Sequence, residues 1–175
     1  MKIKSDIRVA GIIGNPLRQS MSPLIHNYWI KKYAINAIYI PFQINSIINL
    51  NKAIKTFNLV GLNVTIPFKK KVFQKLDRID KAAEKINAVN TIVNKNKILK
   101  GYNTDIYGFG KGLEARIKWN KKRPIYIFGA GGAAEAIAYY FHKLKIHDIT
   151  IVNRTKSKAK KLATKYKGMK FTSKI

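Results

Sequence analysis

A strand-like run, a glycine-rich turn and an alanine-rich helix follow one another without interruption between residues 125 and 144. The turn, Gly129-Ala130-Gly131-Gly132-Ala133-Ala134, matches the pattern G-x-G-x-x-A. In that pattern the first glycine permits the tight turn, the second lets a pyrophosphate approach the backbone, and the small third residue lets helix and strand pack closely. The segment therefore predicts a dinucleotide-binding βα unit. A glycine-rich packing turn without a ligand is the alternative.

The same region raises the question of a membrane span, because residues 125–141 are mostly apolar. However, the stretch contains Glu135 and three glycines, and it approaches the minimum length of a span only by including that carboxylate. Its first residues favour a strand and its last favour a helix. We therefore predict strand–turn–helix and no span.

From Pro124 onward the chain alternates strands and helices, which indicates a parallel α/β unit. Only 52 residues remain from Pro124 to the end, room for about the first half of a six-stranded dinucleotide-binding fold. The predicted elements are strands at 125–128, 149–152 and 169–172, with helices at 132–144 and 155–166.

The residues before Pro124 also alternate, which predicts a second α/β domain. The expected fold class is thus an N-terminal α/β substrate-binding domain followed by the first half of a Rossmann-type parallel-sheet domain. The expected domains are 1–104, a connecting helix and loop at 105–123, and 124–175. Strands are predicted at 7–13, 36–42 and 59–66, a hairpin at 88–94 and 98–102, and helices from Ser22-Pro23, at 47–57, from Pro67 to about Asn87, and at 105–118.

Charge and composition exclude several classes of protein. The formal net charge is +27, from 29 Lys and six Arg against eight acids, but the apolar fraction of 46% is too high for a disordered polycation. The scattered cations favour a solvated basic surface, with attraction to anionic small molecules or to nucleic acid as alternatives. No zinc-finger spacing or RNA-recognition signature supports the last, so we expect no nucleic-acid partner.

The chain contains no cysteine, which excludes disulfides, thiolate nucleophiles and cysteine metal sites. The three histidines, His26, His142 and His147, make no metal-like set and are assigned to packing or surface, so no metal is expected. The apolar stretch near the N-terminus is too short for a secretory signal, and a cytoplasmic location is expected.

A second motif follows the strand at 149–152. An NAD site usually carries an acid about 20 residues after its glycines, for the ribose 2′-hydroxyl. Here the chain has Asn153-Arg154-Thr155, with Lys156 and Lys158 close behind. Positive charge at this place suits a 2′-phosphate, and the predicted cofactor is NADP. An ordinary helix start capped by Thr155 is a compatible alternative.

Polar residues also follow the N-terminal strands, where α/β proteins bind ligands. Asn63, Thr65 and Lys69 surround the end of the strand at 59–66. Asp105 is one of only eight acids; it either begins a helix or holds a lysine ammonium and sets its proton affinity. Ser20 and Ser22 lie at a helix N-terminus, an anion site, although Ser22 can equally be a plain cap.

Together the segments resemble shikimate dehydrogenase. They are GNPLRQSMSP at 14–23, NVTIPFK at 63–69, AVNT at 88–91, GYNTD at 101–105, GAGGAA at 129–134 and NRT at 153–155. The resemblance implies a two-domain α/β enzyme of aromatic amino-acid and chorismate biosynthesis. Such enzymes reduce 3-dehydroshikimate to shikimate, reversibly, with NADPH.

The resemblance also implies roles for individual residues. Ser20 and Ser22 would hold the substrate carboxylate, while Thr65, Asn90 and Asp105 would bind its ring hydroxyls. Lys69, paired with Asp105, would be the acid–base group, and Asn63 would shape the pocket. The cofactor would contact the turn Gly129, Ala130, Gly131, Gly132, Ala133 and Ala134, and then Asn153, Arg154, Thr155 and Lys158.

Two departures from the family pattern stand out. Asn87 replaces a glycine that many members have before AVNT, which we expect to be tolerated. Family members also continue through the rest of the nucleotide domain to a helical segment that returns to the substrate domain. We therefore expect a fragment or a truncated product. The alternatives are a non-catalytic remnant that binds substrate or cofactor weakly, and a quinate-accepting relative; a homodimer is left open.

Overall fold

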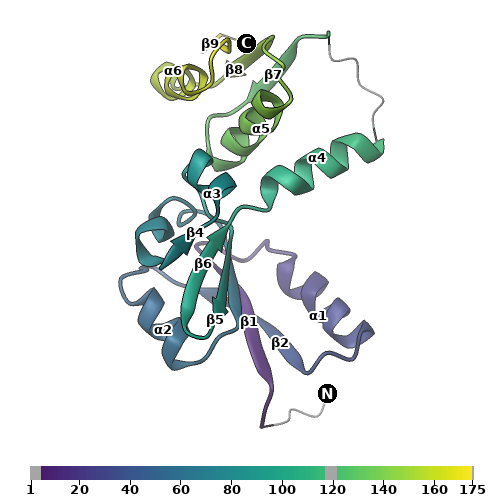
Figure 1. Cartoon of the computed structure of the whole chain (residues 1–175), viewed down its shortest axis with the longest axis vertical. Helices are drawn as coiled ribbons and strands as arrows, with labels where there is room; N and C mark the ends of the chain where they lie inside the picture. The colour runs from purple at the N-terminus through teal and green to yellow at the C-terminus, as the bar shows by residue number, and fades with distance from the viewer. Residues whose placement is uncertain (1–4, 117–121, 175) are drawn as a thin grey trace. The chain divides into compact units, whose positions relative to one another are not determined.

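Short apolar strands alternate with helices along the chain and collect into two separate sheets (Figure 1). The computed structural model describes residues 5–116 and 122–174. The chain divides into two compact units, Met1–Asn103 and Thr104–Ile175. The predicted fold class is confirmed: an α/β unit comes first, and a three-stranded parallel sheet with helices follows.

The first unit contains a six-stranded mixed sheet in the order β2-β1-β3-β5-β6-β4. The central strand β1 runs parallel to β2 and to β3, whereas β5 runs antiparallel to both β3 and β6. The predicted hairpin is confirmed, and Asn96 and Lys97 turn between its strands with positive φ. The strands are β1 (Arg8–Gly14), β2 (Ala37–Gln43), β3 (Gly61–Val64), β4 (Arg78–Ile79), β5 (Thr91–Lys95) and β6 (Ile98–Tyr102).

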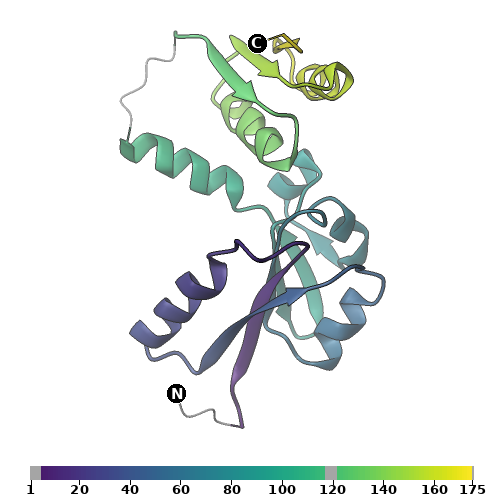
Figure 2. The ribbon, with the colours of Figure 1, turned by 180° about the vertical axis from the view of Figure 1, so that it is seen from behind.

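Helices α1 (Ser22–Lys32) and α2 (Leu50–Thr56) lie on opposite sides of this sheet (Figures 1 and 2). The strand order explains this, because the chain moves from β1 outward to β2 and then back across to β3. Two right-handed crossovers in opposite directions place their helices on opposite faces. The α2 side holds the main core of the unit, in which Ile54, Val72 and Ile92 are fully buried.

Helix α1 exposes several of its larger apolar side chains. Leu24 is 66% exposed and Tyr28 60%, and the helix has no fully buried residue. The prediction that Ser22 caps this helix is wrong. The N-cap position is Met21, no side chain caps it, and Ser22 is already the first helical residue. Its hydroxyl is directed elsewhere, as described below.

The lysine-rich segment after Pro67 is not the continuous helical region expected. It forms a 3-10 turn, η1 (Lys71–Lys75), then the short strand β4, then helix α3 (Lys81–Ile86). Extended backbone at Leu76 ends the turn, and the Asp80 carboxylate accepts a hydrogen bond from the Ala82 N–H to start α3. The stretch contributes Phe68, Val72 and Ala83 to the core, but the extended backbone at Leu76 and the pairing of β4 with β6 interrupt the helix.

The second unit contains β7 (Ile125–Phe128), β8 (Ile149–Val152) and β9 (Lys170–Thr172), parallel and in that order. All three strands were predicted. Helices α5 (Gly132–Lys143) and α6 (Lys156–Lys165) connect them, and α4 (Asp105–Arg116) packs on α5 through Phe109. The suspected membrane span is therefore strand plus helix, and no helix in residues 5–116 or 122–174 is long and apolar enough to cross a bilayer. The predicted loop at 118–123 lies largely outside the described residues.

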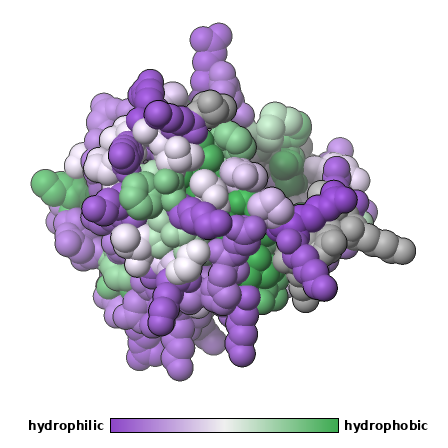
Figure 3. Space-filling view, turned by 90° about the horizontal axis from the view of Figure 1, so that it is seen from above, coloured by the Kyte–Doolittle hydropathy of each residue, from purple (hydrophilic) through white to green (hydrophobic). Residues whose placement is uncertain are grey.

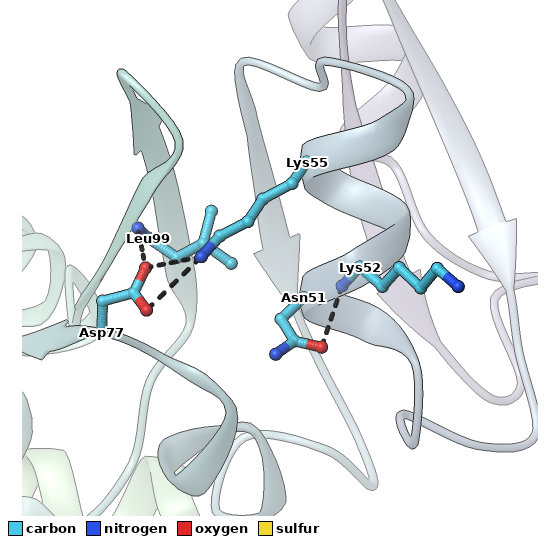
Figure 4. Close-up of polar contacts among 5 residues, drawn as sticks. All are labelled: Asn51, Lys52, Lys55, Asp77 and Leu99. Atoms are coloured by element: carbon cyan, nitrogen blue, oxygen red, sulfur yellow. Dashed lines mark hydrogen bonds and ion pairs between the residues drawn. The ribbon is translucent and has the colours of Figure 1, made fainter.

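One carboxylate, that of Asp77, ties three elements of the first unit together (Figure 4). It accepts a hydrogen bond of 2.8 Å from the Leu99 N–H of β6 and pairs with Lys55 of α2 at 3.2 Å. The Leu99 N–H and the Lys55 ammonium both favour the charged form, so they lower the pKa of Asp77.

We expect Asp77→Ala to lower the free energy of unfolding by about 1 kcal/mol near neutral pH. Because the folded pKa is depressed, Asp77 stabilises the fold above its ordinary pKa. That contribution is lost as the pH falls through the lowered value. Urea unfolding at about pH 6 and about pH 3 should therefore show a smaller difference between wild type and variant at the lower pH.

Asp77→Asn is the matched control, because its amide oxygen can still accept from Leu99 while the charge is gone. It should lose less stability than Asp77→Ala. An Asp77→Ala effect of equal size at both pH values would contradict the role assigned to the ionised carboxylate.

Candidate functional site

The carboxyl ends of β1 and β3 meet at one edge of the first sheet. The Thr65 N–H donates to the Ile13 carbonyl and the Asn15 N–H to the Ile66 carbonyl, each at 2.9 Å. The turns after the two strands therefore lie side by side. Their approach is close: a Cβ on Gly14 would lie 2.4 Å from the Thr65 methyl carbon. A side chain at this position would require Thr65 and Leu17 to shift.

Hydrogen bonds bring two more predicted site residues to this edge. The Asn90 carbonyl accepts from the Val64 N–H at 2.8 Å, directly beside Thr65. The Lys69 carbonyl accepts from the Val89 N–H at 2.8 Å, next to Asn90. Asn90 is buried and Lys69 half-buried. Backbone hydrogen bonds thus bring Asn90 close to Thr65 and Lys69, which precede it by more than 20 residues in the sequence.

The serines and Asn63 join the same edge through Tyr39, a residue that the sequence did not single out. The Ser20 hydroxyl oxygen accepts from the Ser22 N–H at 3.4 Å, and the Tyr39 hydroxyl donates to Asn63 Oδ1 at 2.6 Å. Burial raises the pKa of Tyr39 to about 12, and a hydrogen bond with the Ser22 side chain partly offsets this rise. Protonated at every physiological pH, Tyr39 is a permanent hydrogen-bond donor.

His26 stacks flat on Tyr39, with ring centroids 4.2 Å apart and planes 9° from parallel. Burial lowers the pKa of His26, which favours a neutral ring. Its assignment to packing fits this contact. The sequence signal for Tyr39 is its inward position on β2, where Ala37 and Tyr39 alternate with less buried neighbours. That signal marks a core residue and says nothing about a hydroxyl partner.

In the second unit the glycine turn and the Asn153-Arg154-Thr155 segment follow adjacent parallel strands. The Gly129 N–H donates to the Val152 carbonyl at 2.7 Å, and Phe128 pairs with Val152 in register. The Asn153 amide donates to the Thr155 carbonyl at 2.9 Å, which fixes the turn into α6. Thr155 takes the N-cap position, but its hydroxyl makes no capping bond.

The glycine turn and the start of α5 have features that suit the binding of a phosphate-rich group. No side chain caps the N-terminus of α5, so the first N–H groups of the helix remain available to an anion. The Cβ position of Gly131 has no atom within 4 Å among the described residues, which leaves room for a ligand. Arg154, Thr155 and Lys158 are exposed beside it. These features fit the predicted dinucleotide.

One acid lies in the first turn of α5, and its charge is balanced within the fold. Glu135 is 6% exposed, and one of its carboxylate oxygens lies 2.6 Å from the Lys165 ammonium of α6. The pair offsets a negative charge that would otherwise repel a phosphate at the helix start. No local sequence pattern predicts that Lys165 pairs with Glu135.

Asp105 begins α4 and belongs to the second unit, so its pairing with Lys69 stays a prediction. His142 and His147 also lie in the second unit, in α5 and in the loop before β8. Within residues 5–116 and 122–174, no three metal-ligating side chains gather to hold an ion.

Two family models match the chain. The shikimate dehydrogenase substrate-binding domain matches residues 12–92, and the shikimate/quinate 5-dehydrogenase model matches residues 113–174. Among curated proteins, the NADP(+)-dependent shikimate dehydrogenase of Caldanaerobacter subterraneus subsp. tengcongensis is 44% identical over 165 residues. That match covers 93% of this chain and 59% of the relative.

The solved structures that resemble this chain include shikimate dehydrogenases. A crystal structure of a shikimate dehydrogenase in complex with NADP+ superposes with a TM-score of 0.89 at 38% identity, covering 97% of this chain and 62% of that one. The Thermus thermophilus enzyme in complex with NADP(H) and shikimate gives 0.84 at 28% identity, covering 95% and 63%. The chain thus spans about three fifths of the length of these proteins.

Two of the three glycines in the turn, Gly129 and Gly131, are expected to respond differently to the same substitution. Gly129 has φ of +111°, a conformation that an L-residue adopts only with strain, so Gly129→Ala should cost about 1–2 kcal/mol of stability. Gly131 has φ of −89° and open space at its Cβ, so Gly131→Ala should leave stability unchanged. Urea unfolding of both variants measures this difference.

Dinucleotide affinity should separate the same two variants further. A methyl group at Gly131 would occupy the space through which a pyrophosphate approaches the backbone. Calorimetric titration should therefore show weaker NADP+ binding by a fully stable Gly131→Ala chain. Undiminished affinity in that variant would show that the phosphates do not approach this glycine.

Proposed function

This chain belongs to the shikimate dehydrogenase family, and from that membership we propose that it catalyses the reversible NADPH-dependent reduction of 3-dehydroshikimate to shikimate. The observation that carries the proposal is the convergence of Thr65, Lys69 and Asn90 at one sheet edge, where backbone hydrogen bonds join Thr65 to Ile13 of β1, Asn90 to Val64 and Lys69 to Val89. The Caldanaerobacter relative is an NADP(+)-dependent shikimate dehydrogenase, and the Thermus thermophilus enzyme is solved in complex with NADP(H) and shikimate. On this proposal the protein acts in aromatic amino-acid biosynthesis, and its proposed location is the cytoplasm.

The proposed substrate contacts follow from chemistry. Shikimate carries one carboxylate and a ring with hydroxyl groups. Ser20 and Ser22, hydroxyls at the start of α1, suit the carboxylate, while Thr65 and Asn90 suit the ring hydroxyls. Asn63 would help to shape the pocket, since its side-chain amide is hydrogen-bonded to the hydroxyl groups of Tyr39 and Thr91. Asp105 is the remaining proposed contact.

Lys69 is the proposed acid–base residue. When bound, NADPH supplies a hydride to the substrate carbonyl, which leaves negative charge developing on the oxygen. The Lys69 ammonium donates a proton to that oxygen in reduction, and the amine accepts it in oxidation. A carboxylate beside it, which we assign to Asp105, would hold the ammonium in place.

The proposed cofactor contacts are confined to the second unit. The pyrophosphate would lie on the turn Gly129–Ala134 at the start of α5, and Arg154, Thr155 and Lys158 would contact the 2′-phosphate, with Asn153 fixing the turn. There are two alternatives to the proposed enzymatic function. One is a chain that binds substrate or cofactor without turnover, and the other is a relative that accepts quinate.

Lys69→Met should separate turnover from binding. Because Lys69 acts on a proton in the transition state, we expect NADPH formation from shikimate and NADP+ to fall at least about 100-fold, with shikimate affinity changed less than about threefold. Absorbance of NADPH and calorimetric titration measure the two quantities.

Lys71→Met is the matched control, since Lys71 is exposed and outside the proposed site, and it should behave as wild type. Equal loss of affinity and turnover in Lys69→Met would contradict the proton-transfer role. Binding of shikimate and NADP+ by wild type without any NADPH would favour the binding-only alternative, and faster turnover of quinate than of shikimate would favour the quinate relative.

Arg154→Ala should change cofactor preference. Loss of the guanidinium removes a partner that only the 2′-phosphate needs, so affinity for NADP+ should fall about tenfold or more while affinity for NAD+ stays nearly constant. Lys160→Ala, an exposed cation further along α6, is the control for general charge. An unchanged ratio of the two affinities in Arg154→Ala would show that Arg154 does not contact that phosphate.

A further inference from the structure

Helix α1 determines where the two serines of the proposed carboxylate site lie. Ser22 is its first residue, and Ser20 comes two residues earlier, so the place of both depends on how α1 docks on the sheet. Burial contributes little to that docking, because no residue of α1 is fully buried. Half-buried Ile30 packs on the small core that contains Tyr39 of β2.

Three further residues of α1 contact Tyr39, each at a different part of it, where α1 lies beside β2 (Figure 1). Asn27 bonds its backbone, His26 stacks on its ring with centroids 4.2 Å apart, and the Ser22 side chain hydrogen-bonds to its hydroxyl. Ser22 and His26, four residues apart, share one face of the helix, and Asn27 follows directly. The start and middle of α1 are thus docked on one residue of the outer strand.

The Asn27 amide is the contact among these three whose direction is fixed. Its Nδ2 donates to the Tyr39 carbonyl at 2.8 Å, and its Oδ1 accepts from the Tyr39 N–H at 3.0 Å. A backbone carbonyl can only accept and a backbone N–H can only donate, so the amide has one orientation. Asn27 therefore pairs with β2 as a neighbouring strand would, through one donor and one acceptor.

This pair of bonds restrains a movement that the other two contacts permit. Stacked rings can slide over one another, and a hydroxyl can rotate to follow its partner. The Asn27 amide bonds two backbone groups of one residue, so it loses both bonds when the helix shifts along β2. Asn27 thus fixes α1 along the strand, and Ser22 lies about 7.5 Å from it along the helix axis.

We propose that Asn27 is a positioning residue for the substrate carboxylate, because it fixes α1 on β2 and with it the place of Ser20 and Ser22. The proposal rests on the proposed function, in which the two serines bind the carboxylate of shikimate. In this role Asn27 acts through the helix and does not touch the substrate. Its loss should weaken shikimate binding and spare NADP+, whose proposed contacts are confined to the second unit.

Asn27→Asp tests this, because pH switches the introduced carboxyl between two states. Ionised, it can accept from the Tyr39 N–H but places a charged oxygen against the Tyr39 carbonyl. Protonated, it has one O–H donor and one acceptor oxygen, which reproduce the pair. We expect shikimate affinity about tenfold below wild type at about pH 7.5, and within about twofold of wild type once the carboxyl is protonated.

Calorimetric titration at a series of pH values measures the affinity, and the carboxyl-carbon resonance of residue 27 reports its protonation. Partial burial and the facing carbonyl oxygen disfavour the charged form, whereas Lys31, one turn further along α1, favours it. The titratable neighbours of position 27 on α1 and β2, His26, Lys31 and Tyr39, are the same in wild type. Comparison at equal pH therefore removes their contribution.

Two more variants frame the result. Asn27→Leu removes both hydrogen bonds at similar size, so it should weaken shikimate binding without recovery at low pH. Asn51→Asp is the matched control, because it makes the same change of charge on α2, where exposed Asn51 accepts from the adjacent Lys52 N–H. It should bind shikimate as wild type does at every pH.

Affinity for NADP+ should stay within about twofold of wild type in all three variants, which separates the proposed role from general loss of folding. Two results for Asn27→Asp would overturn the proposal: shikimate affinity equal to wild type at neutral pH, or no recovery after the carboxyl is protonated. These results decide the matter even if Asn27→Leu does not fold.

The backbone amide resonances of Ser20 and Ser22, measured by NMR without ligand, give a readout that does not depend on the proposed function. In Asn27→Asp they should differ from wild type at neutral pH and coincide with it once the carboxyl is protonated. Unchanged resonances at neutral pH would also overturn the proposal. If wild type does not bind shikimate, the proposed function fails, while these resonances still decide whether Asn27 fixes the start of α1.

Discussion

The parallel pairing of β1 with β3 is the constraint on which the first unit depends. It places the ends of two strands, about 50 residues apart in sequence, at one edge, where Ile13 pairs with Val64. Gly14 then allows the following turns to pack together, because any side chain there would collide with Thr65. Backbone hydrogen bonds attach Asn90 and Lys69 to that edge. The backbone of the sheet thus brings Thr65, Lys69 and Asn90 together.

The side chains add orientation to this frame. The backbone places the Asn90 Cα beside Val64, but an amide can still rotate by half a turn with little change in shape. Only directional hydrogen bonds distinguish its oxygen from its nitrogen. The Asn63 amide donates to the Asn90 backbone carbonyl, which can only accept, and the Thr91 hydroxyl donates to Asn90 Oδ1 at 3.0 Å. In this unit the backbone therefore places the residues, and side-chain hydrogen bonds set the orientation of their amides.

The sequence predicted most strands because their apolar runs are bounded by glycine, proline or asparagine. It predicted β7, β8 and the glycine turn with nearly the observed bounds, since that unit is local and regular. It failed between Pro67 and Asn87, where apolar residues recur at helical spacing but the extended backbone at Leu76, the pairing of β4 with β6 and the Asp80 cap divide the segment. Tyr39 and Lys165 were missed because their partners, Asn63 and Glu135, are more than 20 residues away and leave no local pattern.

Net charge explains less of the proposed cofactor preference than its size suggests. Hydrophilic side chains cover much of the face in Figure 3, in keeping with lysines scattered along the whole chain. At physiological salt, exposed charges separated by more than about 8 Å hardly interact, so most of the +27 acts on no single ligand. Preference for a 2′-phosphate must come from cations within reach of it. Arg154 and Lys158 follow β8, next to the glycine turn, and the nearest acid in the turn's own helix, Glu135, is already paired with Lys165. In the proposed complex, Arg154 and Lys158 would distinguish NADP from NAD, whereas the pairing of Glu135 with Lys165 would favour the pyrophosphate that both dinucleotides carry.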